Sequence, residues 1–246
     1  MLKLPYTGCN PRGLVLARDK ALGKKILYYH RVQVPEFAVF PMGRKAKRPR
    51  GLGFPLIVKS LLEQASLGIS QASVVDSDDK LQERVAFIHE RLQTDAIAES
   101  FIEGREIYVG VMGNDKLEVL PPWELLFTKD DSDAPLIATA RAKWDLEYQK
   151  KKGIVSQQAK NLPAGFHERA NTLCKRIYRM LGLSGFARLD FRLDAEGKLY
   201  FLEANPNPQI AADEDFALSA QAAGYPYDDL IQKLLLLGLR AAPPVE

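Results

Sequence analysis

Two carboxylates and an amide near the C-terminal end of the chain have the side-chain chemistry to hold a metal ion. They are Asp190, Glu203 and Asn205, in the segment GFARLDFRLDAEGKLYFLEANPNP that covers residues 185–208. Two stretches of alternating apolar and polar residues flank the connection 195–198, which has a common length for a hairpin loop. With that loop, Asp190 falls opposite Glu203, and Asn205 falls opposite an arginine. All three candidate ligands then share one face of the hairpin.

The other face of this hairpin is wholly apolar in the same register. It pairs Leu189, Phe191 and Leu193 with Ala204, Leu202 and Tyr200, respectively. A slip of one residue would mix apolar and charged side chains on both faces. The hydrophobic pattern therefore predicts the register of the two strands.

The polar face brings like charges together, which is unfavourable unless a cation lies between them. Mg²⁺ is typically held by one or two carboxylates together with the oxygens of substrate phosphates. Arg188, opposite Asn205, adds a positive charge beside such a site. The alternative is a solvated hairpin face with arginine–carboxylate surface pairs, since surface sheets often carry mixed charge.

A lysine at the end of an apolar strand is a second candidate for chemistry. Lys59 ends the stretch 56–59, and the small-residue connection EQASLG follows at 63–68. Phosphate groups are bound by such a point charge and by backbone N–H groups that approach closely. A lysine that simply ends a strand in solvent is the alternative. The sequence has no GxxxxGK[ST] segment, which excludes a P-loop.

The elements that must position these residues alternate between strands and single helices. An N-terminal helix places Leu22, Ile26 and Tyr29 on one face and lysines on the others. The pattern further predicts strands at 37–40, 56–59, 69–75, 96–99 and 106–111, helices at 78–93 and 164–182, and two C-terminal helices after the hairpin. Strands followed by single helices, twice over, predict two α+β lobes.

Two connections stand out in this pattern. Residues 102–105 join two predicted strands and are the expected hinge between the lobes. Residues 128–160 are polar with little periodicity, which predicts either a mobile functional loop or a disordered stretch.

Composition limits the class of protein. The chain has 246 residues, of which 46% are hydrophobic and 26% charged, with a net charge of +3; these values are ordinary for a soluble globular protein. No apolar run approaches the ~18 residues of a membrane span, so we expect a cytoplasmic protein without a membrane partner. The basic run 44–50 lacks interleaved aromatic residues, so we interpret it as a solvated loop rather than a nucleic-acid site.

Five stretches resemble the ATP-grasp ligases, and D-alanine–D-alanine ligase in particular. They are PYTGCNPRGLVLARDKALGKK, FPLIVKSLLEQASLGIS, AIAESFIEGREIYVGVMGN, ARAKWD and the hairpin segment 185–208, and together they span nearly the whole chain. The resemblance implies a two-lobed α+β fold that holds ATP between two antiparallel sheets. The central subdomain would cover residues 1–102, and the C-terminal subdomain with the metal site would cover 103–246.

The resemblance also implies a role for each candidate residue. Lys20 and Lys59 would contact the ATP phosphates, and the loop around Ser66 would close over them. The adenine hinge would consist of Glu99, Phe101 and Ile102, and Glu106 would bind the ribose. Lys143 is similar to the phosphate-contacting lysine of the family's mobile loop, which makes 128–160 a lid. Asp190, Glu203 and Asn205 would hold Mg²⁺, with Mn²⁺ as the alternative ion, and Arg188 would stabilise charge on the acyl phosphate.

The implied reaction joins a small-molecule carboxylate to an amine, both of them amino acid-like. The carboxylate attacks the γ-phosphate of ATP to give an acyl phosphate and ADP, and the amine then displaces phosphate. A catalyst of this kind needs positioning and charge neutralisation rather than a protein nucleophile.

The chain departs from the family at three places. The family has an N-terminal domain before PYTG, so a missing domain or a second chain is the expected partner. Glu63, Gln64, Ala65 and Ser66 stand where the family has a richer Gly/Ser loop. After Asn205 the family has a Gly- and Ser-containing segment that receives the substrate carboxylate, whereas this chain has Asp213, Glu214 and Asp215. These acidic residues indicate either a cationic acceptor other than D-alanine or plain capping of a helix.

Two functions of different classes follow from these observations. The first is an ATP-dependent ligase that forms a C–N bond, favoured by the intact set around Arg188 and Asp190. The second is a nucleotide-binding module without turnover that serves as a regulatory or partner-binding subunit, favoured by the expected loss of the first domain.

Overall fold

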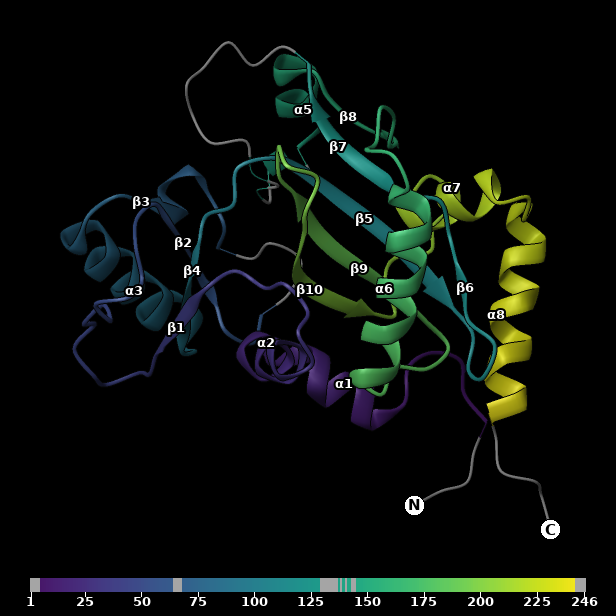
Figure 1. The fold of residues 1–246 in the computed structure, drawn as a ribbon, viewed down its shortest axis with the longest axis horizontal. Coiled ribbons are helices and arrows are strands. Elements are labelled where there is room, and N and C mark those ends of the chain that lie inside the picture. The colour runs from purple at the N-terminus through teal and green to yellow at the C-terminus, as the bar shows by residue number, and fades with distance from the viewer. Residues whose placement is uncertain are drawn as a thin grey trace.

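The computed structural model describes residues 5–63, 68–128, 137, 139, 141–142 and 145–241. In this part of the chain, two antiparallel sheets lie side by side, each with helices against it, which confirms the predicted two-lobed α+β class (Figure 1). The helices are α1 (Pro11–Arg18), α2 (Lys20–Tyr29), α3 (Asp78–Leu92), α5 (Leu146–Lys152), α6 (Phe166–Met180), α7 (Asp215–Ala222) and α8 (Tyr227–Ala241). The strands are β1 (Phe37–Phe40), β2 (Leu56–Ser60), β3 (Val74–Val75), β4 (Ala96–Ser100), β5 (Arg105–Met112), β6 (Glu118–Val119), β7 (Trp123–Phe127), β8 (Ile154–Gln158), β9 (Phe186–Leu193) and β10 (Leu199–Pro206).

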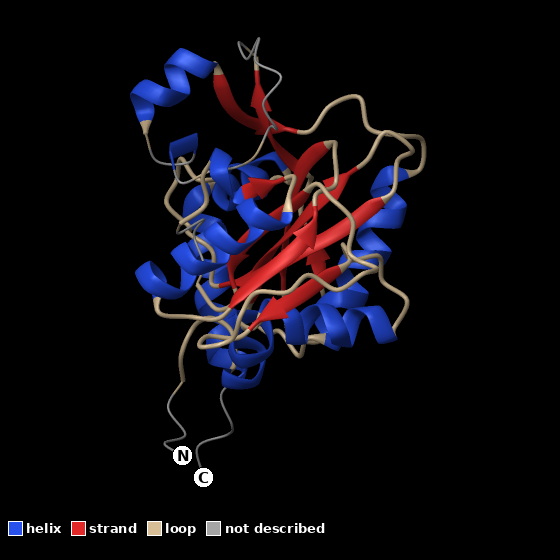
Figure 2. Ribbon diagram, turned by 90° about the vertical axis from the view of Figure 1, so that its left-hand side faces the viewer, coloured by secondary structure: helices blue, strands red, loops and turns tan. Residues whose placement is uncertain are grey.

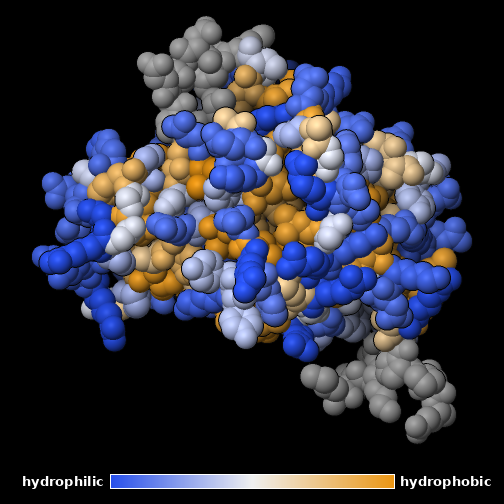
Figure 3. Space-filling model, viewed as in Figure 1, coloured by the Kyte–Doolittle hydropathy of each residue, from blue (hydrophilic) through white to orange (hydrophobic). Residues whose placement is uncertain are grey.

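The smaller sheet has the strand order β1-β4-β2-β3 and carries α3 on one face. Ser77 caps α3 by accepting a hydrogen bond from the Lys80 N–H, and the helix ends at Gln93 in the left-handed conformation. Its buried residues Leu81, Val85 and Ile88 recur at helical spacing and pack against the sheet. The predicted helix 78–93 is therefore confirmed almost to the residue. The left-hand end of the molecule, where α3 and the connection 41–55 lie, is largely hydrophilic on the face drawn in Figure 3.

The predicted strand 69–75 is wrong over most of its length. Only Val74 and Val75 pair with β2, and a 3-10 turn, Gln71–Ser73, precedes them. Ser70 and Ser73 explain the turn, because the Ser70 N–H donates to Ser73 Oγ at 3.0 Å and the Ser73 N–H donates to the Ser70 carbonyl at 2.9 Å. Serine side chains that bond to nearby backbone compete with a sheet ladder.

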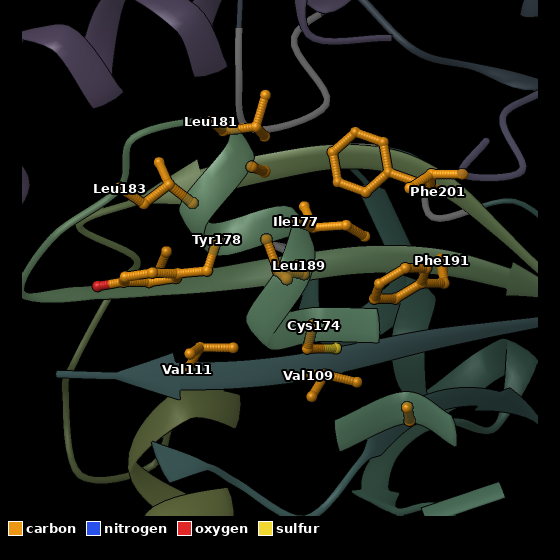
Figure 4. Close-up of a cluster of buried hydrophobic side chains, with 14 of the residues drawn as sticks. Val109, Val111, Cys174, Ile177, Tyr178, Leu181, Leu183, Leu189, Phe191 and Phe201 are labelled. Carbon is orange, nitrogen blue, oxygen red and sulfur yellow. The ribbon is translucent and has the colours of Figure 1, made fainter. Parts of the chain in front are cut away.

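The larger sheet has the order β10-β9-β5-β7-β8, with β6 paired to β5. One face of β5 and β9 packs against α6 in the main core, whose residues include Val109, Ile177 and Leu189 (Figure 4). The other face packs against α7 and α8, so that helices flank the strands on both sides (Figure 2). Gly110 permits this contact, since a Cβ there would lie 3.0 Å from Phe216.

The first two helices also pack on the larger sheet. Leu27 of α2 belongs to the main core, and α1 and α2 both contact β10. The predicted buried face of α2 is wrong: Leu22 and Tyr29 are exposed, whereas Lys20 and Lys24 are buried. The reason is that these lysines point to carboxylates and carbonyls of both sheets, described below. The division of the chain at residue 102 stays a prediction.

The hairpin of β9 and β10 has the predicted register at its open end. Asp190 lies opposite Glu203, Arg188 opposite Asn205 and Leu189 opposite Ala204. Nearer the loop the prediction is wrong, because a β-bulge at Leu202 shifts the pairing so that Phe191 faces Phe201. The loop then spans 194–198 rather than 195–198.

The polar region 128–160 contains regular structure where a loop or disorder was predicted. Helix α5 and strand β8 both lie in it, and β8 adds to the edge of the larger sheet beside β7. Asp145 caps α5, and Gly153 ends it in the left-handed conformation. Among the described residues, no helix is both long and apolar enough to cross a membrane.

Candidate active site

A cleft of about 730 Å³, partly open to solvent, lies between the two sheets. We call it the intersheet cleft. It is lined by eight of the predicted site residues: Lys20, Lys59, Glu99, Phe101, Ile102, Glu106, Asp190 and Glu203. These residues come from α2, β2, β4, β5, β9, β10 and the connection 101–104 that joins the two sheets. Residues separated by most of the chain therefore converge at one place, as the sequence predicted for an ATP site.

A buried carboxylate with two lysines forms the floor of the cleft. Glu99 has no exposed surface, and its Oε1 lies 3.0 Å from Lys24 Nζ while its Oε2 lies 3.1 Å from Lys59 Nζ. Burial alone would raise the pKa of Glu99, but the two ammonium groups lower it below its ordinary value. Glu99 is therefore ionised at neutral pH, because the positive charges replace the solvation it has lost.

The two lysines of this floor differ in their surroundings. Burial lowers the pKa of Lys24, and Glu99 offsets only part of that effect. Burial also acts on Lys59, but the carboxylates of Glu99 and Glu203 outweigh it and raise the pKa of Lys59. Lys59, at the cleft wall, thus holds its positive charge firmly.

Lys20 enters the cleft from the N-terminal end of α2. Its ammonium donates a hydrogen bond to the Glu63 carbonyl and lies 3.7 Å from Glu203 Oε2. Asp19 caps the helix by accepting from the Leu22 N–H at 2.9 Å, which fixes where α2 begins. Lys20 and Lys59 therefore bring two positive charges to the same cleft from a helix and a strand.

The predicted metal-binding face of the hairpin contains a tight polar group. Arg188 makes two hydrogen bonds to Asp190, from Nε to Oδ1 at 2.8 Å and from Nη2 to Oδ2 at 2.9 Å. Asn205 Nδ2 donates to the same Oδ2 at 3.0 Å. Burial by itself would lower the pKa of Arg188, but Asp190 raises it above its ordinary value. Arg188 is thus a permanent cation held in one orientation by a bidentate contact.

A second polar group lies on β5 at the rim of the cleft. Glu106 accepts a hydrogen bond from the Tyr108 hydroxyl at 2.8 Å and lies 3.3 Å from Arg192 Nη2. Arg192 also donates to the Gly104 carbonyl at 2.8 Å and stacks over Phe101. These contacts fix the start of β5 next to the connection that joins the sheets.

In the described part of the chain, a second pocket has no lining residue in common with the intersheet cleft, but hydrogen bonds from two of its residues to Asp190 link the two. Arg188 and Asn205, the hydrogen-bond partners of Asp190, line this pocket together with Tyr108, Ser156, Asp213, Glu214 and Asp215. We call it the acidic pocket. Asp215, the first residue of α7, accepts a hydrogen bond from Ser156 and lies 3.8 Å from Arg188 Nη1. A ligand in either pocket would therefore approach the same Arg188–Asp190 pair.

Two predicted site residues, Ser66 and Lys143, lie outside the described residues. The sequence analysis also missed residues that the structure brings to the site. Lys24 lies one helical turn after Lys20, so the spacing could have revealed it had lysine not been assigned to a solvent face. Arg192 follows Asp190 by two residues in a strand, and strand alternation could have indicated that both share a face.

Comparison with known proteins agrees with this geometry. The family model described as D-ala D-ala ligase C-terminus matches residues 21–236. A protein of Sinorhizobium fredii, y4sG, is 33% identical over 96% of this chain and 66% of its own length. D-alanine–D-alanine ligase of Desulforudis audaxviator is 31% identical over 96% of this chain and 74% of its own length. The chain thus spans about two thirds to three quarters of these relatives.

The fold is shared with solved ligases. The crystal structure of D-alanine–D-alanine ligase from Bacillus anthracis complexed with ATP superimposes with a TM-score of 0.80, at 24% identity, over 98% of this chain and 72% of that protein. The protein is thus of the ATP-grasp ligase class. Within that class, the chain belongs to the D-alanine–D-alanine ligase family, as its motifs predicted.

Proposed function

We propose that this chain binds ATP in the intersheet cleft and catalyses ATP-dependent ligation of a carboxylate to an amine. The observation that carries the proposal is the convergence of Lys20, Lys59 and Asp190 on the intersheet cleft, with Arg188 hydrogen-bonded to Asp190 from the neighbouring pocket. A ligase of the same fold was crystallised with ATP. Since the chain spans only part of its relatives, a further domain or a second chain would complete the first substrate site.

The roles proposed for the cleft residues are those that the resemblance to the ATP-grasp ligases implies, and the charges and positions of these residues are consistent with them. Lys20 and Lys59 are the candidates for the phosphates, with Ser66 and Lys143 as contributors from segments outside the described residues. Phe101 and Ile102, with Glu99 before them, would hold the adenine, and Glu106 would accept from the ribose hydroxyls. A nucleotide in this orientation would direct its γ-phosphate toward the hairpin.

The hairpin residues fit a hard divalent cation. Asp190, Glu203 and Asn205 supply oxygen donors on one face of two paired strands, and Asp190 and Glu203 are directly opposite each other. Two carboxylates and an amide are the donor set that Mg²⁺ or Mn²⁺ accepts when phosphates complete its coordination. The cation would neutralise charge on the transferred phosphoryl group.

The chain's own residues would carry the rest of the catalysis. The substrate carboxylate oxygen forms a bond to the γ-phosphorus as the bond to the ADP oxygen breaks. The amine nitrogen then forms a bond to the acyl carbon, phosphate leaves and the amine loses a proton. Arg188, fixed by Asp190, would stabilise the negative charge of both steps without reorganising. Closure by the segment around Lys143 would keep water from the acyl phosphate.

The acidic pocket is the proposed site of the acceptor amine. Asp213, Glu214 and Asp215 would repel a carboxylate and attract an ammonium group, so we expect an acceptor other than D-alanine. Capping of α7 by the same residues is the plainer role of these carboxylates, although Glu214 at the N-cap position makes no side-chain capping hydrogen bond. Turnover of a panel of acceptors with and without a second cationic group distinguishes recognition of an ammonium group from capping of α7.

The first test is ligand-induced stabilisation of the wild type and of Glu203→Gln by Mg²⁺ with a non-hydrolysable ATP analogue. Ligand at about 100 times its Kd adds about 2.7 kcal/mol to the free energy of unfolding. We expect a shift in melting temperature that is reduced in the variant, and release of ADP from ATP with a specific carboxylate–amine pair. Binding without turnover on any pair would support the regulatory module instead, and no shift in either protein would contradict the ATP site.

A further inference from the structure

Helix α2 sends two lysines, one helical turn apart, to the junction of the sheets. Lys20 contacts the Glu63 carbonyl, which follows the smaller sheet, and Glu203 of the larger sheet. Lys24 contacts Glu99 of the smaller sheet and donates to the Leu202 carbonyl of the larger sheet. Residues four apart lie on the same face of a helix, so α2 ties the two sheets together at successive levels.

The two lysines differ in their access to the intersheet cleft. Lys20 lines the cleft, whereas Lys24 is fully buried and is not among the lining residues. Its cation lies 5.9 Å from the ring centroid of Phe201. A ligand in the cleft can therefore contact Lys20 and Lys59, but it can respond to Lys24 only through another residue. Glu99 is one such residue, since it lies between Lys24 and Lys59. Leu202, whose carbonyl accepts from Lys24, is another.

The charges of this buried group determine what Lys59 offers a ligand. Among Lys24, Glu99 and Lys59 there are two positive charges and one negative charge, which leaves one positive charge in surplus. Without Lys24, Glu99 and Lys59 would form a neutral buried pair. Buried charges interact strongly because little solvent screens them. The attraction of Lys59 for an anion would then be largely cancelled by its own partner.

The β-bulge at Leu202 adds a geometric requirement. The bulge interrupts the pairing between Phe201 and Glu203, and the Leu202 carbonyl accepts from Lys24. Glu203, the next residue, is a proposed metal ligand. Lys24 therefore fixes β10 directly before that residue while it holds Glu99 Oε1, which leaves Oε2 directed to Lys59.

We infer that Lys24 is a positioning residue for the nucleotide phosphates: it occupies Glu99 so that Lys59 keeps a surplus positive charge in the cleft. The inference rests on the proposed function, because it assumes that a nucleotide binds there. It predicts that loss of Lys24 weakens binding of the phosphates much more than binding of the nucleoside.

The test is calorimetric titration of the folded chain with Mg²⁺ plus a non-hydrolysable ATP analogue and, separately, with adenosine. Lys24→Met keeps an unbranched side chain without the charge, and Lys25→Met on the exposed side of the same helix is the matched control. We expect Lys24→Met to weaken binding of the analogue about 10-fold or more, as for loss of a hydrogen bond to a charged group. Adenosine binding should weaken much less than binding of the analogue, and Lys25→Met should match wild type for both ligands.

A double variant tests the charge argument directly. In the double variant Lys24→Met with Glu99→Gln, Lys59 is the single charge of the group. The ratio of analogue affinity to adenosine affinity should therefore be higher in this double variant than in Lys24→Met. If Lys24→Met does not fold, the same ratio in the double variant is compared with wild type and should be similar. The inference is overturned if Lys24→Met binds the analogue as wild type does, if both ligands weaken equally, or if the double variant loses further phosphate preference. Failure of the wild type to bind either ligand would instead contradict the proposed ATP site.

Discussion

The intersheet cleft and the acidic pocket are linked by the hydrogen bonds between Asp190 of the cleft and Arg188 of the pocket, but they are built from different kinds of structure. The cleft takes its charged residues from regular elements: Lys59 and Glu99 lie on paired strands and Lys20 on a helix. The acidic pocket takes two of its carboxylates from the segment between β10 and α7, where Asp213 is exposed, and the third, Asp215, from the first position of α7. Loops on a rigid scaffold vary more readily than the scaffold. The comparison supports the proposal that the nucleotide site rests on the rigid scaffold, whereas the acceptor site lies where the chain can vary more readily.

The largest effect should come from the buried charge of the cleft. Glu99→Gln leaves Lys24 and Lys59 without their shared carboxylate, and removing one partner of a buried ion pair costs about 3–5 kcal/mol. Urea unfolding should show this loss. Glu103→Gln, on an exposed residue of the connecting segment, should change stability by less than about 0.5 kcal/mol. Equal losses of stability in the two variants would show that the buried Glu99 carboxylate contributes no more to the free energy of unfolding than the exposed Glu103 carboxylate does.

The same residue should make stability depend on pH in the acid range. The pKa of Glu99 is lowered in the folded chain, so its stabilising contribution is present above the unfolded value of about 4.3 and is lost as pH falls through the folded pKa. Unfolding free energies of wild type and Glu99→Gln, measured from neutral to acid pH, should therefore converge at the acid end. A constant difference between the two proteins at all pH values would show that the carboxylate is not the titrating group.

The junction of the two pockets should be next in the size of its effect. Asp190→Asn removes a candidate metal ligand and the charged partner of Arg188, and we expect kcat to fall by about 10²–10³-fold, as for loss of one preorganised electrostatic group. ADP release under saturating ATP measures this. Glu196→Gln, at an exposed position of the hairpin loop, is the control. Unchanged turnover in Asp190→Asn would contradict the assignment of the metal site to the hairpin.

The sequence predicted the cleft better than it predicted the elements around it. Strict alternation over Arg188 and Asp190 identified the polar face, because one face of that hairpin is buried in the main core and any other register would bury charge. The prediction failed at Leu202, where a bulge breaks the alternation. A bulge serves a tertiary contact, here with the buried Lys24, and alternation within one hairpin carries no sign of it.

The failure at α2 has a related cause. Periodicity separated the apolar residues of this helix from its lysines but gave no sign that Lys24 is internal, because the partners of Lys20 and Lys24 lie far away in the sequence, at Glu203 and Glu99. Local patterns do not report such partners. Region 128–160 was likewise judged by its weak periodicity, although β8 pairs along the length of β7 and needs little hydrophobic content at a sheet edge.

The smallest effect should come from the acidic pocket, and it tests the other half of the comparison. Asp215→Asn removes one of the carboxylates near Arg188 while Asn keeps the side-chain size. For an acceptor with a second ammonium group, kcat/KM should fall about 3- to 10-fold, the scale of a partly solvated charge pair. A neutral acceptor should lose less or gain, and affinity for the ATP analogue should not change. Asp228→Asn, on the exposed start of α8, is the matched control.

An equal fall for both acceptors would assign Asp215 to holding Ser156 and Arg188 in place rather than to recognition of a cation. A fall confined to the cationic acceptor would show that two pockets linked through the Arg188–Asp190 pair have separable tasks.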